Sequence, residues 1–160
     1  MIIRHANLND VEILAQIEEQ SYPKEEKASK NSIEQRIKTF GNYFWILEEN
    51  NNILAFINGM LTDKENLVDE MFEDATLHND KAPNFMVFSV VTNPNFRGKG
   101  YAKILLNKMI ADLTKQNKKQ IVLTCKEHLL KFYASFGFIN EGISNSNHGG
   151  VSWYQMRKKL

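Results

Sequence analysis

Residues 85–113 read FMVFSVVTNPNFRGKGYAKILLNKMIADL, and this segment carries the clearest structural pattern of the chain. The apolar run from Phe85 to Val91 is typical of a strand that is buried on both faces. A short polar turn follows from Thr92 to Asn95, in which Pro94 disfavours an early helix. Beyond it, apolar residues recur at helical spacing, at Ala102, Leu105, Leu106, Met109, Ile110 and Leu113. The stretch therefore predicts a strand, a glycine-containing turn and an amphipathic helix that begins at the glycines.

The turn from Arg97 to Ala102 has the composition of an anion-binding loop. The first amides of a helix lack internal partners and carry the positive end of its dipole. Glycines let the backbone approach an anion, and Arg97 and Lys99 add positive charge. Tyr101 stands where a P-loop has Ser or Thr, and Lys103 stands where a dinucleotide fingerprint has its third glycine. A plain connection between strand and helix is the alternative that this pattern alone leaves open.

Composition limits the class of protein. The 160 residues predict a single domain over residues 1–160, and 42% apolar with 24% charged residues is ordinary for a globular protein. A net charge of +1 gives no reason to expect a nucleic-acid partner. No apolar run approaches the roughly 18 residues of a spanning helix, so no membrane partner is expected.

The single cysteine and the scattered histidines argue against a metal site. Cys125 alone excludes an internal disulfide and a cysteine-based metal site, and it suits a reducing, cytoplasmic location. A buried thiol without a basic partner is also not expected to act as a nucleophile. His5, His78 and His128 show no ligand spacing among them.

The rest of the chain predicts an alternation of strands and helices. Further strands are expected at Ile2–His5, Tyr43–Glu48, Ile53–Leu61, Gln120–Cys125, Phe138–Ile143 and Val151–Arg157. Further helices are expected from Val11 to about Gln20, around Ile33, Ile37 and Phe40, around Leu67–Phe72, and over Leu129, Phe132, Tyr133 and Phe136. The segment Glu49–Asn52 between two of the strands is a hairpin signal.

This order of elements resembles that of the GNAT N-acetyltransferases, whose Arg-x-x-Gly-x-(Gly/Ala) loop corresponds to Arg97, Gly100 and Ala102. The resemblance implies an α/β fold with a mixed, splayed, seven-stranded sheet and flanking helices. It also implies a cleft between the fourth and fifth strands, Phe85–Thr92 and Gln120–Cys125. Acetyl-CoA is the implied co-substrate, with no metal. Its implied contacts are the fourth strand at Val90 and Val91, and the loop residues Arg97, Gly98, Lys99, Gly100, Tyr101 and Ala102.

The C-terminal third is similar to one branch of that family, the arylalkylamine N-acetyltransferases and their bacterial relatives. The motifs are Leu123–Glu127, Phe132–Phe138 and Gly142–Tyr154. The animal enzymes of this branch carry two histidines on the fourth strand, which relay the proton of the amine. Met86 and Phe88 stand at those positions here, and neither side chain takes up a proton.

The resemblance implies a catalytic role for Tyr133, because a tyrosine on the helix after the fifth strand points at the CoA sulfur in that family. A core tyrosine on an aromatic helix face is the alternative. A backbone amide of Val90 or Val91 in a bulged fourth strand would hold the thioester oxygen as it becomes anionic.

The general base stays open at this point. Glu25 or Glu26 lies near the cleft entrance in relatives, and His148 in the last hairpin titrates in the right range. For each of them the alternative is a solvated loop residue, and a chain of water molecules is a further route for the proton.

The expected function is transfer of acetyl from acetyl-CoA to a primary amine by direct attack in a ternary complex. The acceptor is expected to be a small apolar or aromatic amine, because Phe44, Phe56, Met86 and Phe88 are apolar. A polyamine or a protein N-terminus stays open as acceptor, and a homodimer stays open as assembly. The rival from another class is an acyl-CoA-binding sensor or interaction domain without turnover.

Overall fold

The computed structural model describes residues 1–145 and 150–160. The described residues form a seven-stranded sheet in the order β1-β2-β3-β4-β5-β7-β6. The strands are β1 (Ile2–His5), β2 (Phe44–Glu49), β3 (Asn52–Thr62), β4 (Asn84–Thr92), β5 (Gln120–Cys125), β6 (Ile139–Ile143) and β7 (Tyr154–Lys159). Neighbouring strands are antiparallel, except that β4 and β5 run parallel. The predicted mixed α/β sheet is therefore confirmed.

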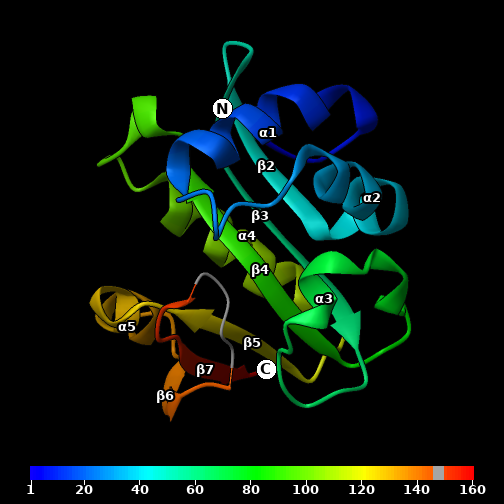
Figure 1. Ribbon diagram of the computed structural model, residues 1–160, viewed down its shortest axis with the longest axis vertical. Coiled ribbons are helices and arrows are strands. Elements are labelled where there is room, and N and C mark those ends of the chain that lie inside the picture. The colour runs from blue at the N-terminus through cyan, green and yellow to red at the C-terminus, as the bar shows by residue number, and fades with distance from the viewer. Residues whose placement is uncertain (146–149) are drawn as a thin grey trace.

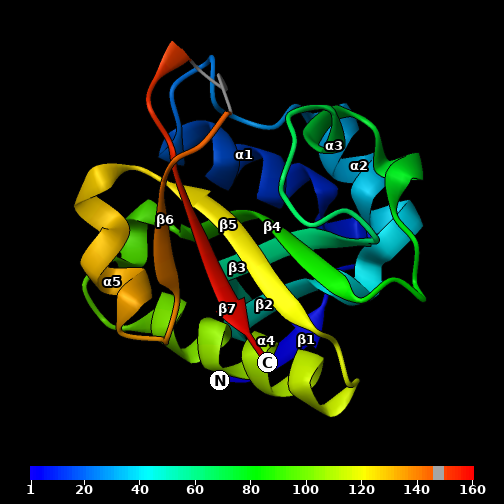
Figure 2. The ribbon, with the colours of Figure 1, turned by 90° about the horizontal axis from the view of Figure 1, so that it is seen from below.

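Helices cover both faces of the sheet (Figures 1 and 2). The helices are α1 (Val11–Ser21), α2 (Lys30–Phe40), α3 (Glu70–Glu73), α4 (Tyr101–Lys115) and α5 (Leu130–Ala134). Figure 2 shows α1, α2 and α3 on one side of the sheet and α4 on the other. None of the helices in the described part of the chain has the length and apolarity that a membrane crossing requires.

Alternation along β2 explains why the sheet needs a cover on each face. Trp45 and Leu47 join the apolar cluster that contains the buried side of α4, whereas Phe44 and Ile46 join the cluster formed with α1 and α2. Successive side chains of a strand point to opposite faces, so a strand that is apolar throughout must be covered on both.

The hairpin between β2 and β3 confirms the expectation drawn from its asparagines. Asn50 and Asn51 have φ angles of 51° and 64°, in the left-handed region that asparagine tolerates better than most residues. Two consecutive left-handed residues match the twist of a tight hairpin.

The later elements are shifted relative to the expectation. The last strand begins at Tyr154, where its pairing with Cys125 of β5 begins, and not at Val151. The helix expected over Leu129–Phe136 is a 3-10 turn followed by the short α5, and Gly137 with φ of 91° ends the segment. A 3-10 turn also forms at Pro94–Phe96, where proline is tolerated as the first helical residue.

The strand β4 departs from regular geometry at two places that matter for the site. On its β3 side, Asn58 pairs with Ser89 and Gly59 with Val87, so Phe88 is an extra residue and forms a β-bulge. On its β5 side, pairing is confined to Asn84–Met86 against Gln120–Val122. Beyond these residues β4 and β5 separate, which confirms the predicted cleft between them.

Gly59 allows β3 to approach the bulge closely. A Cβ atom at this position would lie 2.2 Å from the Met86 carbonyl oxygen. We expect Gly59→Ala to lower the free energy of unfolding by about 3 kcal/mol, because the clashing atom belongs to backbone. Gly142→Ala is the matched control, since a Cβ there meets open space and costs only left-handed backbone strain of about 1 kcal/mol. Urea denaturation measures both variants, and equal losses would contradict the close approach.

Candidate functional site

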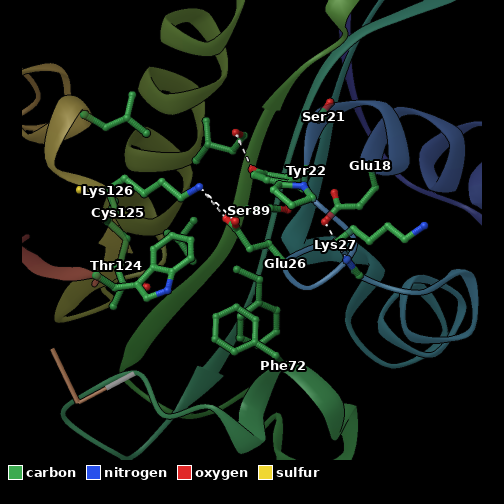
Figure 3. Close-up of a pocket in the computed structure, with 18 of the residues that line it drawn as sticks. Glu18, Ser21, Tyr22, Glu26, Lys27, Phe72, Ser89, Thr124, Cys125 and Lys126 are labelled. Atoms are coloured by element: carbon green, nitrogen blue, oxygen red, sulfur yellow. Dashed lines mark hydrogen bonds and ion pairs between the residues drawn. The ribbon is translucent and has the colours of Figure 1, made fainter. Parts of the chain in front are cut away.

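A cavity of about 410 Å³ lies where β4 and β5 separate (Figure 3). One wall comes from the end of α1, the start of α2 and the connection between them, and includes Glu26. The floor comes from residues 87–90 of β4, and the opposite wall from residues 123–126, 128 and 129 together with Tyr133. Phe72, Glu73 and Trp153 complete the lining.

The cavity brings together some of the predicted site residues and leaves others outside. Glu26, Phe88, Val90 and Tyr133 line it, although they come from separate parts of the chain. The remaining predicted pocket residues lie elsewhere: Met86 is fully buried where β4 still pairs with β5, and Val91, Phe44 and Phe56 pack in the cluster with α1 and α2. His148 lies outside the described residues.

Tyr133 lines the cavity from α5. The side chain is 6% exposed, and its ring packs edge-on against Phe132 and Phe138. Within residues 1–145 and 150–160, the Tyr133 hydroxyl makes no hydrogen bond. Burial raises the pKa of Tyr133 above its ordinary value, so the hydroxyl stays protonated at neutral pH.

The Tyr22 hydroxyl donates a hydrogen bond to the Val90 carbonyl at 3.4 Å. The Asn93 amide donates a hydrogen bond to the Leu54 carbonyl of β3 at 2.9 Å, and Asn93 lies two residues after Val91. Main-chain groups alternate along an antiparallel strand, so the groups of Val91 point toward β3 and those of Val90 point toward the gap. Of the two valines, Val90 therefore offers its backbone to the cavity. Tyr22 was not predicted, because a tyrosine before Pro23 indicates only the end of a helix.

The glycine loop lies between β4 and α4 and does not line the cavity. Gly98 and Gly100 have φ angles of 82° and 78°, and a Cβ at either would meet open space. Ile104 donates to the Gly100 carbonyl at 3.2 Å, so the amides before Ile104 lie ahead of the helical ladder. The electrostatic influence of Arg97 reaches Tyr22 and partly opposes the rise of its pKa that burial causes.

A buried arginine supports the floor of the cavity. Arg36 is 5% exposed, and it donates to the Asn58 side-chain oxygen at 3.1 Å and to the Phe72 carbonyl at 2.8 Å. Its guanidinium lies 4.7 Å from the ring centroid of Phe88, the bulged residue. Burial lowers the pKa of Arg36 to about 10, so it remains charged at neutral pH. In sequence this arginine looks like any solvated helix residue.

An ion pair joins two walls of the cavity. The Lys126 ammonium lies 2.9 Å and 3.1 Å from the two carboxylate oxygens of Glu26, as Figure 3 shows. It also lies 5.7 Å from the ring centroid of Trp153, within the range of a cation–π contact. The contact ties the connection between α1 and α2 to the end of β5. Sequence spacing could not reveal it, because the partners lie 100 residues apart.

Cys125 lies at the same end of β5 and is 3% exposed. Its sulfur lies 3.7 Å from the Met156 sulfur, in an apolar setting. In the described part of the chain, no group of three or more His, Cys, Asp or Glu side chains could hold a metal ion.

Residues 11–138 match the family model described as "Acetyltransferase (GNAT) family". A similar protein is the serotonin N-acetyltransferase of Mesocricetus auratus, 29% identical over 113 residues, which are 70% of this chain and 53% of that protein. Another is an uncharacterized N-acetyltransferase, ycf52, of Gracilaria tenuistipitata var. liui, 26% identical over 104 residues, 64% of this chain and 54% of that one. The chain thus spans about half the length of these relatives.

Solved structures share the fold at low identity. The GNAT-like decarboxylase GphF in complex with isobutyryl-CoA has a TM-score of 0.84 at 16% identity, over 99% of both chains. The PaiA N-acetyltransferase of Thermoplasma acidophilum in complex with coenzyme A has a TM-score of 0.74 at 18% identity, over 99% of this chain and 98% of that one. These likenesses concern the fold alone.

Burial raises the pKa of the Cys125 thiol to about 11, so the thiolate forms only at high pH. We expect Ellman's reagent at pH 8 to label the native protein at least about a hundredfold more slowly than the urea-unfolded chain. The native rate should rise about tenfold per pH unit up to pH 10, because the thiolate fraction does. Cys125→Ser supplies the blank, and fast native labelling at pH 8 would contradict the buried setting.

Proposed function

The chain belongs to the acetyltransferase (GNAT) family, and on this basis we propose that it transfers acetyl from acetyl-CoA to a primary amine. The supporting observation is that Tyr133 and Val90 line one cavity, at the point where β4 and β5 separate. Membership of the family by itself supports an acyltransferase. The direct route, with both substrates bound at once, needs no nucleophile from the protein, and the buried Cys125 offers none.

The residues present fit an acyl-CoA substrate. The loop amides at Gly98 to Tyr101 would hold the pyrophosphate, with Arg97 and Lys99 adding charge. A Cβ added at Gly98 or Gly100 would meet open space, which leaves room for such a group. The pantetheine arm would lie along the backbone of β4 beyond Met86, where β5 no longer pairs with it. Solved structures of this fold hold coenzyme A or an acyl-CoA, which supports the same assignment.

In the proposed reaction, the amine nitrogen attacks the thioester carbonyl carbon and the C–S bond breaks. The Val90 amide would donate to the carbonyl oxygen as negative charge develops there. The Tyr133 hydroxyl would donate to the departing sulfur. Since the raised pKa of Tyr133 lies above the value of about 8.5 for a thiol, we expect the hydroxyl to stabilise the departing thiolate by its hydrogen bond, with complete transfer of the proton to sulfur uphill.

The lining of the cavity supports a small amine with an apolar or aromatic body. Phe72, Phe88 and Trp153 supply apolar wall. The similarity to serotonin N-acetyltransferase agrees with an arylalkylamine-like branch. Glu26 is the proposed acceptor of the amine's proton, because its carboxylate lies in the cavity. A polyamine or a protein N-terminus are the competing acceptors.

A binding domain without turnover is the rival function. It is favoured by Met86 and Phe88, which stand where animal relatives of the proposed branch have a histidine pair and which take up no proton. Release of CoA thiol from acetyl-CoA over a panel of primary amines decides between the two. An enzyme releases thiol with at least one amine above the rate without acceptor, and a binding domain with none.

Gly100→Asp tests the CoA loop. The variant places a carboxylate where the pyrophosphate would lie, so we expect the affinity for acetyl-CoA to fall at least about thirtyfold, or about 2 kcal/mol. Calorimetry measures the affinity directly. Gly142→Asp is the matched control, because Gly142 also has a positive φ and open surroundings but lies on β6. An unchanged affinity in folded Gly100→Asp would remove the loop from the binding site.

Tyr133→Phe tests the proposed role of the Tyr133 hydroxyl as donor to the departing sulfur, because the variant keeps the ring and its packing. We expect kcat for the best amine of the panel to fall about a hundredfold or more, with acetyl-CoA affinity within a few fold of wild type. Tyr43→Phe is the control, since Tyr43 is also buried but donates to Gln116, away from the cavity. A near wild-type kcat with chemistry rate-limiting, or a joint loss of CoA binding and stability, would assign Tyr133 to the core.

A further inference from the structure

We propose that Glu26 and Trp153 form the ammonium-binding subsite of the acceptor, and that Lys126 occupies this subsite until an acceptor displaces it. The inference rests on the proposed function, because it names the chemical class that the acceptor cavity selects. The class is a primary alkylammonium, and Lys126 is itself one, held inside the cavity by the same groups.

The contacts of Lys126 are those that a small protonated amine would need. Its ammonium lies 2.9 Å and 3.1 Å from the two oxygens of Glu26 and 5.7 Å from the ring centroid of Trp153. A carboxylate and an aromatic face together satisfy both the charge and the apolar surroundings of an alkylammonium. Glu26, Lys126 and Trp153 all line the cavity that holds Tyr133. The subsite therefore lies in the space where the proposed transfer takes place.

The two partners of the ion pair differ in their freedom to leave it. The Glu26 side chain is 5% exposed, whereas the Lys126 side chain is 36% exposed. A desolvated carboxylate is costly when its charge is not balanced, so the ionised form of Glu26 favours a bound cation. The lysine has a flexible stem and can place its charge in water instead. Exchange of Lys126 for an acceptor ammonium keeps the carboxylate paired and changes no buried charge.

The need to displace Lys126 makes the cavity selective for protonated amines. A protonated amine can replace Lys126 on Glu26, whereas a neutral or anionic molecule cannot and meets a cavity that the lysine partly fills. The apolar remainder of the acceptor would extend toward Phe72 and Phe88, which line the same cavity. Lys126 competes with the acceptor for Glu26. The apparent affinity of the protein for the acceptor is therefore its intrinsic affinity multiplied by the fraction of time for which the subsite is free.

The test is a calorimetric titration of phenethylamine into the protein saturated with CoA, which carries no acetyl group and allows no turnover. We expect Lys126→Met to bind phenethylamine about tenfold more tightly than wild type, as for a subsite that the lysine holds about 90% of the time. Lys126→Arg keeps the ion pair and should show no gain. Glu26→Gln should lose at least tenfold in both backgrounds.

Two controls separate displacement from general effects of charge. Lys27→Met removes a cation from the same cavity, but the Lys27 ammonium lies 3.1 Å from Glu19 and not on Glu26, so its gain should be much smaller. 2-Phenylethanol, which has the same ring without the charge, should bind Lys126→Met and wild type alike. Thermal melts and the affinity for CoA itself confirm that each variant is folded and loaded.

Three results would overturn the subsite. They are equal phenethylamine affinity in Lys126→Met and wild type, an equal gain in Lys27→Met, and a loss of CoA affinity in Lys126→Met, which would make Lys126 a CoA contact. Because the titration needs no acetyl transfer, tighter amine binding by Lys126→Met supports the subsite even if no amine is acetylated. Transfer of acetyl with unchanged amine affinity would refute the subsite and leave the proposed function intact.

Discussion

The short parallel contact between β4 and β5 determines the rest of the structure. The two strands pair only from Asn84 to Met86, and their separation beyond that point opens the sheet without ending it. A sheet that splits in its middle has main-chain groups without strand partners in its interior, and such groups must find other partners. Tyr22 supplies one of them at Val90. The cavity thus results from the limited pairing of β4 with β5, and the side chains line it.

Local patterns made the frame of the molecule predictable. The strand, loop and helix of residues 85–113 could be derived because helical spacing, glycine placement and strand apolarity all act over a few neighbouring residues. The same holds for the hairpin at Asn50 and Asn51, whose backbone angles suit that residue type. Boundaries set by distant partners were less accurate, as at Tyr154, where the strand begins because Cys125 lies opposite.

The side chains that line and support the cavity were only partly predictable, because their positions depend on contacts between distant segments. Tyr133 and Glu26, which both line the cavity, were predicted as site residues through resemblance to a family, and no spacing rule would have chosen them. Arg36 sits in a polar helix sequence, and its burial depends on Asn58 and on a carbonyl 36 residues away. A charged group that is buried in one fold and solvated in another has the same appearance in a sequence. The bulge at Phe88 is likewise set by pairing with β3.

That bulge makes the geometry of the cavity depend on a residue count. One additional residue in β4 shifts the alternation of everything after it, so that Val90 turns its backbone to the gap while Val91 packs among α1 and α2. A β4 one residue shorter could keep every side chain in this discussion and still present the opposite set of main-chain groups to the cleft. In evolution, substitutions along this strand would therefore be tolerated more readily than insertions or deletions, and the length of the strand would be conserved more strictly than its sequence.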